Sequence, residues 1–190
     1  LKKHPHVAIL SDEIYDRLIF DNKPMSTFFN YPDLYDRLIV LNGWSKTYAM
    51  TGWRLGWGVW PEKLVEHIVK FCVNNHSCVN AAVQFGGIAA LDGDEEQLNG
   101  MMKEFSVRRK LIHEGLNSLK GVECSLPGGA FYVFPDFSSY MGNDNKIKSS
   151  DDLSLYFLEQ KAVVTVAGKA FGSDNNVRFS TIGDISKLPK

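Results

Sequence analysis

The stretch that decides the fold runs from residue 38 to residue 60 and reads LIVLNGWSKTYAMTGWRLGWGVW. It opens with four apolar residues, 38–41, and turns at Asn42-Gly43. A short uninterrupted apolar run closed by turn residues is typical of a strand covered on both faces, as in a parallel sheet. Residues 55–60 form the next candidate strand, so Lys46 is predicted to lie in the loop between two strands.

The apolar pattern recurs upstream, and helical spacing takes over downstream. The run 7–10 is apolar throughout, which predicts another buried strand. After Pro61, which suits the start of a helix, apolar residues recur at helical spacing between 64 and 72. Two more helices are predicted, one over 79–91 and a long one over 94–121.

The sequence pattern changes in the second half of the chain. Short apolar runs predict strands at 122–125, 130–134, 163–166 and 177–180. Between them, Ser150 or Asp151 is predicted to cap a short helix that ends near Lys161. The chain is therefore predicted to be α/β, with a mainly parallel sheet in residues 1–96 and a smaller α+β domain in residues 97–190.

Composition and charge restrict the class of protein. The 190 residues are 44% hydrophobic and 23% charged, and 21 basic residues against 22 acidic ones give a formal charge of -1. This is the balance of a globular protein, and it indicates no nucleic-acid or membrane partner. Three scattered cysteines predict neither a disulfide framework nor a metal site, so a reducing, cytoplasmic location is expected.

Lys46 and Arg54 are the first candidates for chemistry. Open α/β sheets bind ligands at the carboxyl ends of their strands, where Lys46 is predicted. A partly desolvated lysine amine can attack an aldehyde, and the fork of an arginine flanked by glycines, as Arg54 is, matches a phosphate. Taken singly, Lys46 fits a solvated loop lysine better, and Arg54 fits an ordinary surface salt bridge.

Asp12 and Tyr15 follow the first predicted strand in the sequence SDEIY, residues 11–15. A carboxylate at that point can keep a ring nitrogen protonated and make the ring a better electron sink, and a tyrosine can donate to an oxygen on the same ring. Asp12 capping the next turn, with Tyr15 in the core, is the simpler explanation of either residue alone. Glu13 is a second available carboxylate, and spacing does not choose between the two.

Together, these motifs resemble those of the class I/II aminotransferases, enzymes of pyridoxal-phosphate (PLP) fold type I, and most of all the aspartate and aromatic aminotransferase branch. The resemblance rests on five motifs in the family's order: Asp-x-x-Tyr at 12–15, Ser-Lys at 45–46, Gly-Trp-Arg at 52–54, Gly-Gly-Ala-Phe-Tyr at 128–132 and Val-Arg-Phe-Ser at 177–180. It extends over nearly the whole chain. It implies the C-terminal part of the PLP-binding large domain, followed by a small domain without its last helix.

The resemblance implies a role for each residue on the cofactor side. Lys46 would bind pyridoxal 5′-phosphate covalently and would move the proton between substrate and cofactor. Asp12 would pair with the ring nitrogen, and Tyr15 would hydrogen-bond the ring oxygen. Arg54, helped by Ser45, would bind the phosphate. No metal is expected.

On the substrate side, the resemblance implies that Arg178 grips the substrate's α-carboxylate in a bidentate fork, with Phe131 and Tyr132 nearby. The substrates would be an amino acid and a 2-oxo acid. Aspartate with 2-oxoglutarate is favoured over aromatic amino acids. The full-length protein would be a homodimer.

Two positions depart from the family pattern. Gly43 stands where many relatives have a serine that gives the phosphate one more hydroxyl, and Trp44 replaces a smaller residue. The family's earlier asparagine, glycine-rich phosphate turn, ring-stacking aromatic residue and N-terminal arm would all precede this segment. We therefore expect a fragment that is cut at both ends and is inactive by itself.

Other functions share these motifs. A C–S β-lyase or an aminocyclopropane-carboxylate-synthase-like enzyme would use the same cofactor residues, and assays of keto-acid exchange against pyruvate and ammonia release separate them. A non-catalytic PLP-binding domain of a transcription regulator would carry a DNA-binding region upstream. An unrelated α/β protein would have to match five ordered motifs by chance.

Overall fold

A computed structural model describes residues 1–142 and 147–183 of the chain. It is a mixed α/β protein with two compact units, Leu1–Leu98 and Asn99–Lys190, and the division falls close to the boundary predicted after residue 96. Each unit has its own three-stranded sheet. Part of the predicted polar loop and the predicted end of the small domain lie outside the described residues.

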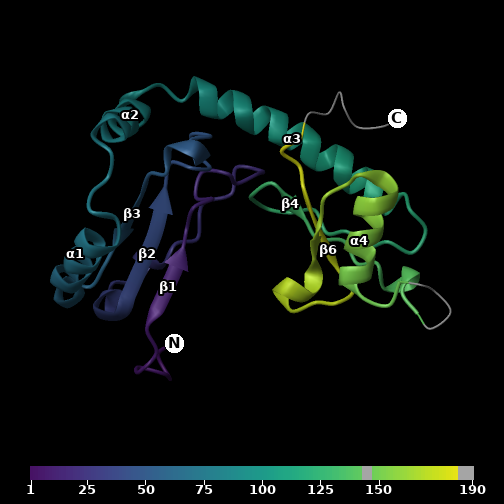
Figure 1. Ribbon diagram of the computed structural model, residues 1–190, viewed down its shortest axis with the longest axis horizontal. Coiled ribbons are helices and arrows are strands. Elements are labelled where there is room, and N and C mark those ends of the chain that lie inside the picture. Colours follow the sequence, from purple (N-terminus) through teal and green to yellow (C-terminus); the bar gives the residue numbers. More distant parts are fainter. Residues whose placement is uncertain (143–146, 184–190) are drawn as a thin grey trace. The chain divides into compact units, whose positions relative to one another are not determined.

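The sheet of the first unit has the order β1-β2-β3, with strands β1 (Ile9–Asp12), β2 (Leu38–Gly43) and β3 (Gly56–Val59) side by side (Figure 1). Strands β1 and β2 are parallel, and Asp12 is opposite Leu41. Strand β3 is antiparallel to β2, and Gly43 is opposite Gly56. All three strands were expected from the apolar runs, and β3 adds an antiparallel edge to the parallel pair.

The core of the first unit lies against β1 and β2. Ile9, Leu34, Leu38 and Val40 form a buried cluster, and the rings of Phe28 and Phe29 pack against it. The aromatic residues belong to the short helix η1 (Phe28–Asn30), and Leu34 belongs to η2 (Pro32–Arg37). The two apolar runs are therefore joined by a segment that folds back over the strands.

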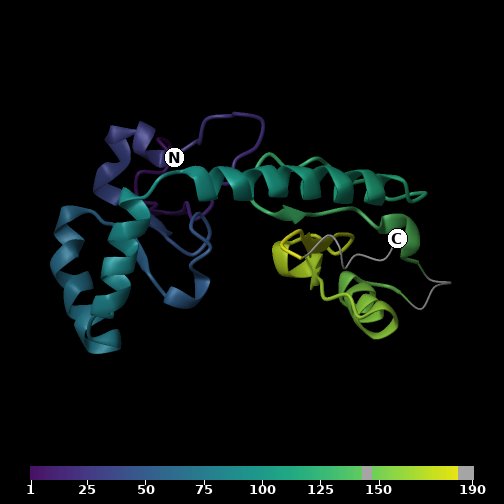
Figure 2. The same ribbon diagram turned by 90° about the horizontal axis from the view of Figure 1, so that it is seen from above.

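Three helices follow β3, as predicted from the spacing of apolar residues. They are α1 (Glu62–His76), α2 (Ala81–Asp92) and α3 (Glu96–Asn117). The Asn80 side chain caps α2 by accepting a hydrogen bond from the Val83 N–H at 3.3 Å. Helix α3 is uninterrupted over its 22 residues (Figure 2). No helix in the described part of the chain is long and apolar enough to span a membrane.

The second unit is built on an antiparallel sheet of order β4-β6-β5. Its strands are β4 (Tyr132–Val133), β5 (Val166–Ala167) and β6 (Val177–Ser180). Helix α4 (Ser150–Lys161) supplies Leu153 to a buried cluster with Val122, Phe137 and Val177. The short helices η4 (Ser138–Tyr140) and η5 (Gly168–Phe171) complete the unit.

The prediction of a strand at 122–125 was wrong. Glu123 makes only an isolated bridge with Asp136. The backbone of Cys124 is instead bonded to the side chain of Asn117, which accepts from its N–H at 3.0 Å and donates to its carbonyl at 2.9 Å. A side chain at the end of α3 therefore takes the hydrogen bonds that a strand partner would have made.

Two further boundaries moved. The strand predicted at 163–166 begins only at Val166, because Ala162 is left-handed (φ 53°) and the Val163 N–H still bonds the end of α4. The cap of α4 is Ser149, whose hydroxyl accepts from the Asp152 N–H at 3.1 Å. The prediction of Ser150 or Asp151 for this role was wrong, because Ser150 is fully buried and bonds elsewhere, and Asp151 lies in the first turn of the helix.

Candidate active site

Strand register gathers three predicted residues at one edge of the first sheet, namely the edge at which β1 and β2 end and β3 begins. Because β1 and β2 are parallel, Asp12 at the end of β1 and Lys46, shortly after the end of β2, lie at the same edge. Because β3 runs the other way, Arg54, just before β3, belongs to that edge as well. Residues far apart in the sequence therefore meet through the hydrogen-bonding pattern of the sheet.

The structure distinguishes between the two adjacent carboxylates. Glu13 is buried, and its carboxylate accepts hydrogen bonds from the Ser11 hydroxyl at 3.0 Å and the Phe28 N–H at 3.2 Å. Asp12 is exposed, and among the described residues its side chain accepts only from the Ile14 N–H, at 3.2 Å. Glu13 therefore serves the packing of the unit, and Asp12 is the carboxylate that a ligand can reach.

Lys46 lies in a loop that is tied to the segment after β1. The buried Thr47 donates from its hydroxyl to the Asp16 carboxylate at 3.3 Å. This contact places Lys46 beside Tyr15, with its Nζ atom 5.9 Å from the centre of the tyrosine ring. Both side chains are half-buried. The lysine and the tyrosine that the motifs single out are therefore neighbours.

The two positions that depart from the family pattern fit the local packing. A Cβ atom on Gly43 would lie 2.8 Å from the Leu55 carbonyl oxygen and 2.9 Å from Gly56 Cα, so a serine would force the two strands apart. The Trp44 indole N–H donates to the carbonyl of Gly87 in α2 at 3.0 Å. The larger side chain at position 44 thus links the Lys46 loop to a helix.

Arg54 occupies a strained turn between η3 (Thr51–Trp53) and β3. Its backbone is left-handed (φ 54°, ψ 45°), a conformation that costs a residue with a side chain about 1–3 kcal/mol. Its guanidinium is exposed and donates from Nη1 to the Thr51 carbonyl at 2.8 Å. Ser45 is half-buried, and its hydroxyl forms no hydrogen bond with any described residue. Both groups can therefore donate to an anion.

Arg178 lies on β6 in the second unit, in contact with two aromatic rings. Its guanidinium carbon is 4.3 Å from the centre of the Tyr132 ring and 4.6 Å from that of Phe171. Phe131 and Tyr132 were both predicted to lie on the substrate side, and of the two only Tyr132 is seen in contact with Arg178, whereas the ring of Phe131 stacks on Phe105 of α3 at 5.5 Å. Phe171 was not predicted, because no motif spacing connects it to Arg178.

A polar contact in this unit joins the start of α4 to the loop before β6. The hydroxyl and the N–H of Ser150 donate to the same oxygen of Asp174, at 2.7 and 3.0 Å. These two donors hold the pKa of the Asp174 carboxyl below its ordinary value of 3.8. The contact is an anchor for the loop rather than a site for a ligand.

The buried Cys124 thiol is not a candidate nucleophile. Burial raises the pKa of the Cys124 thiol above its ordinary value of 9.0, although a hydrogen bond with the Phe134 backbone acts in the opposite direction. A thiol in that state is a poor nucleophile at neutral pH.

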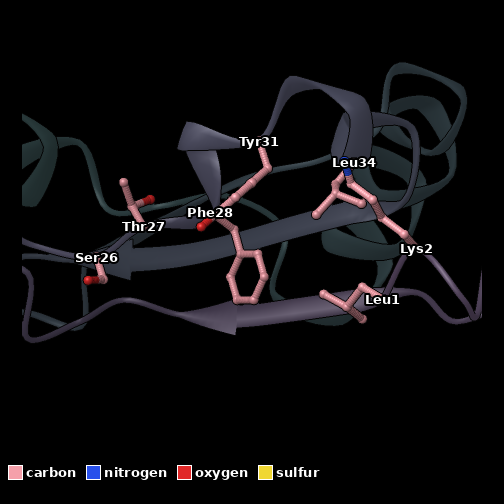
Figure 3. A pocket seen from close by; sticks show the side chains of 7 residues that line it. All are labelled: Leu1, Lys2, Ser26, Thr27, Phe28, Tyr31 and Leu34. Atoms are coloured by element: carbon pink, nitrogen blue, oxygen red, sulfur yellow. The ribbon is translucent and has the colours of Figure 1, made fainter.

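A pocket of about 420 Å³ lies elsewhere in the first unit (Figure 3). Its lining consists of Leu1, Lys2, Ser26, Thr27, Phe28, Tyr31 and Leu34. The six residues predicted for cofactor and substrate are all absent from this lining. The pocket is therefore not part of the candidate site, even though Phe28 also helps to hold Glu13.

The fold and the sheet edge define an α/β protein that can bind an anionic carbonyl compound through a lysine, a carboxylate and an arginine. The sequence matches the family described as aminotransferase class I and II over residues 1–189. The chain belongs to this family, as the order of the motifs predicted.

Individual relatives agree with this assignment. The chain is 36% identical to an aspartate aminotransferase of Pinus pinaster, over 98% of the chain and 39% of that protein. It is 38% identical to an aspartate/prephenate aminotransferase of Cereibacter sphaeroides, over 95% of the chain and 46% of the relative. The chain thus spans less than half the length of these relatives.

Solved structures confirm the predicted fold class. The structure of an aspartate aminotransferase from Rhizobium meliloti matches with a TM-score of 0.90 and 34% identity, over 97% of this chain and 47% of that one. An aromatic aminotransferase from Pyrococcus horikoshii matches with a TM-score of 0.86 and 33% identity, over 96% and 48%.

Proposed function

We propose that the full-length gene product containing this chain is a PLP-dependent aminotransferase. It would move an amino group between an amino acid, with aspartate favoured, and a 2-oxo acid such as 2-oxoglutarate. The observation that carries the proposal is the convergence of Asp12, Lys46 and Arg54 at one sheet edge. The aspartate aminotransferase names of the relatives support the choice of substrate.

The residues at the sheet edge fit the chemistry of PLP. The cofactor supplies an aldehyde carbon and an electron-accepting ring when it is bound. The half-buried amine of Lys46 suits the aldehyde, and the accessible Asp12 carboxylate suits a protonated ring nitrogen. Arg54 uses one nitrogen for the Thr51 carbonyl, which leaves donors on the rest of its guanidinium for a phosphate.

Each side chain has a defined task in the proposed reaction. Lys46 would hold the cofactor through its amine and, once displaced by the substrate's amino group, would take the proton from the substrate's α-carbon. Asp12 would keep a proton on the ring nitrogen. Tyr15, next to Lys46, would donate a hydrogen bond to the ring oxygen. Ser45 would add a hydroxyl to the phosphate contacts of Arg54.

Arg178 would bind the α-carboxylate common to both substrates. A guanidinium presents parallel N–H groups that match a carboxylate in two hydrogen bonds. Two such bonds fix the orientation of the substrate, so the α-hydrogen is held in one direction during proton transfer. Among the described residues, no carboxylate pairs with Arg178, so its fork is open to a substrate.

The experiment that tests this proposal is reductive trapping of PLP on the protein. The full-length gene product and the 190-residue chain are each mixed with PLP, reduced with borohydride and mapped by mass spectrometry. A phosphopyridoxyl adduct on Lys46 in the full-length protein, lost in Lys46→Arg and kept in Lys63→Arg, is the expected result. An adduct on another lysine, or none, would show that the Lys46 motif has been misinterpreted.

The reaction type is tested separately from the cofactor. Amino-group exchange between aspartate and 2-oxoglutarate is expected, with oxaloacetate and glutamate as products. Release of pyruvate and ammonia from a cysteine conjugate would indicate a C–S β-lyase instead. Binding of PLP without turnover of either substrate would favour a non-catalytic cofactor-binding domain.

Assembly and location are further parts of the proposal. A homodimer is supported by the family and by apolar side chains exposed on α1 and α2, such as Phe71 (64% exposed) and Phe85 (73%), which suit cover by another chain segment or subunit. Light scattering of the full-length protein tests this. The free cysteines Cys72, Cys78 and Cys124 support a cytoplasmic location, which cell fractionation tests.

A further inference from the structure

The contacts of Arg178 show how its side chain is held. A guanidinium carries its N–H groups in the plane of the group, whereas its faces carry none. Aromatic rings that lie over a guanidinium attract the cation and leave the in-plane N–H groups free for a carboxylate. Tyr132 and Phe171, the aromatic pair, lie over Arg178 at 4.3 and 4.6 Å.

We propose that the aromatic pair, Tyr132 and Phe171, positions the Arg178 guanidinium to bind a carboxylate. The pair would restrict the long side chain to one orientation before the substrate arrives, which lowers the entropy lost on binding. This inference rests on the proposed function, because it assigns the substrate's carboxylate to Arg178. It adds Phe171, on a separate loop, to the residues that determine substrate affinity.

The sheet positions the first member of the pair. Tyr132 on β4 is opposite Ser180 on β6, and Arg178 is two residues before Ser180. Alternate residues of a strand point to the same face, so Tyr132 and Arg178 are diagonal neighbours on one face of the sheet. This contact follows from strand register and requires no additional support.

A closed loop positions the second member of the pair. Phe171 ends η5, and the loop is closed by hydrogen bonds from the Gly168 N–H to the Asn176 carbonyl at 2.9 Å and from the Ser173 N–H to the Gly168 carbonyl at 3.0 Å. A Cβ atom on Gly168 would collide with the carbonyl oxygens of Asn176 and Ser173. The loop is therefore closed too tightly for any residue but glycine at its start.

Helix α4 anchors this loop at two points. The fully buried Ser150 hydroxyl donates to Asp174 at 2.7 Å and accepts from the Lys169 N–H at 3.1 Å. Lys169 and Asp174 lie on opposite sides of Phe171 in the sequence. One hydroxyl thus holds both arms of the loop, and the Phe171 ring lies perpendicular to that of Phe134, with 5.9 Å between the ring centres.

Phe171 contributes little to the core, which makes its role measurable. The side chain is 50% exposed, so replacing it with leucine removes the π face while little packing is lost. We expect Phe171→Leu in the full-length protein to raise KM for aspartate and for 2-oxoglutarate by about 3- to 30-fold, with kcat little changed. Phe171→Tyr keeps a ring and should retain the KM values of the unmodified protein.

A double-mutant cycle tests whether Phe171 acts through Arg178. In an Arg178→Leu background, Phe171→Leu should cause no further rise in KM, because the group that it positions is gone. Tyr156→Leu removes an exposed ring from α4 of the same unit and should leave KM unchanged. An equal KM increase in both backgrounds, or a drop in kcat alone, would overturn the inference.

The same variants separate this inference from the proposed function. If the unmodified protein shows no turnover, 2-oxoglutarate is titrated against it by calorimetry. Weaker binding in Phe171→Leu, with Phe171→Tyr unaffected, would support the aromatic pair even though the aminotransferase proposal had failed. Equal binding in all three proteins, or no binding to the unmodified protein, would overturn the role of the pair.

Discussion

The two units present their functional side chains by different means. In the first, Asp12 is the last residue of β1, Lys46 and Arg54 lie on loops, and strand register brings all three to one edge. In the second, Arg178 lies within a strand, and the side chains that contact its guanidinium in the described part of the chain are two aromatic rings. The first arrangement would suit several different contacts around one cofactor, and the second would suit a single bidentate contact with a carboxylate.

This difference shows how each unit fixes the position of its functional side chains. A loop residue needs anchors, and Thr47, which bonds Asp16, and Trp44, which bonds Gly87, supply them for Lys46. A strand residue has its backbone held by the sheet already, so only its side chain remains to be ordered. Changes to Lys46 should therefore abolish chemistry, whereas changes around Arg178 should mainly alter affinity.

The largest expected effect is that of Lys46→Ala. Loss of the amine removes both the covalent link to PLP and the group that moves the α-proton, and a general acid or base alone contributes about 10²- to 10⁴-fold. We expect kcat for aspartate with 2-oxoglutarate to fall by at least about that factor, measured in a coupled assay. Lys63→Ala, an exposed lysine on α1, is the control and should retain full activity.

Arg178→Leu should have the next largest effect, expressed mainly in KM. Removing one partner of a charged, bidentate contact costs about 2–5 kcal/mol, so kcat/KM should fall by about 30- to 4,000-fold. Arg178→Lys keeps the charge and loses the fork, and it should fall between leucine and the unmodified protein. If leucine and lysine behave alike, charge is irrelevant at this position and the two units do not divide their roles as described.

Much of the fold could be predicted because it depends on apolar patterns. The runs at 7–10 and 38–41 became β1 and β2, and helical spacing located α1 to α3. The failures have local causes in single hydrogen bonds. No residue propensity indicates that the Asn117 side chain will hydrogen-bond the backbone of Cys124. Nor does any indicate that the Val163 N–H will bond a carbonyl at the end of α4. Such competition depends on tertiary contacts that a pattern does not contain.

The candidate site likewise contains residues that the sequence predicted and residues that only the structure could identify. Motif order pointed to Lys46 and Arg178, whose chemical types are distinctive. Spacing left Asp12 and Glu13 open and the resemblance chose Asp12, but the physical reason for that choice required the structure, in which Glu13 is buried and accepts two hydrogen bonds. Phe171 was out of reach, because its contact with Arg178 depends on a loop closed by hydrogen bonds rather than on spacing.

A third prediction concerns stability, and it tests the packing of the first unit. Gly43→Ser would place a side chain against Leu55 and Gly56, and such overpacking costs about 1–3 kcal/mol. A lower unfolding midpoint in denaturant is expected for the full-length protein. Gly52→Ser is the matched control, because a Cβ atom there meets no atom within 4 Å. A stable Gly43→Ser variant would mean that the two strands separate easily.

The smallest effect is expected for Asp174→Asn in the second unit, and it should depend on pH. The Ser150 donors lower the pKa of Asp174, so the folded protein binds this proton less readily than the unfolded chain does. The resulting stability is present above the ordinary value of 3.8 and is lost as the pH falls below it, through the lower folded-state pKa. The stability difference between the two proteins should therefore shrink as the pH falls through that range.

Amide exchange locates the same effect in the structure. Asp174→Asn weakens the acceptor that fixes Ser150, so the Lys169 N–H, which donates to the Ser150 hydroxyl, should exchange faster at neutral pH. Asp152→Asn is the appropriate comparison, because the pKa of Asp152 is also lowered, mainly by its hydrogen bonds with the Lys148 backbone and the Ser149 side chain, yet Asp152 does not contact Ser150 in this way. Faster exchange at Lys169 in both variants would mean that the helix end, rather than the Ser150–Asp174 contact, holds the loop beside Arg178.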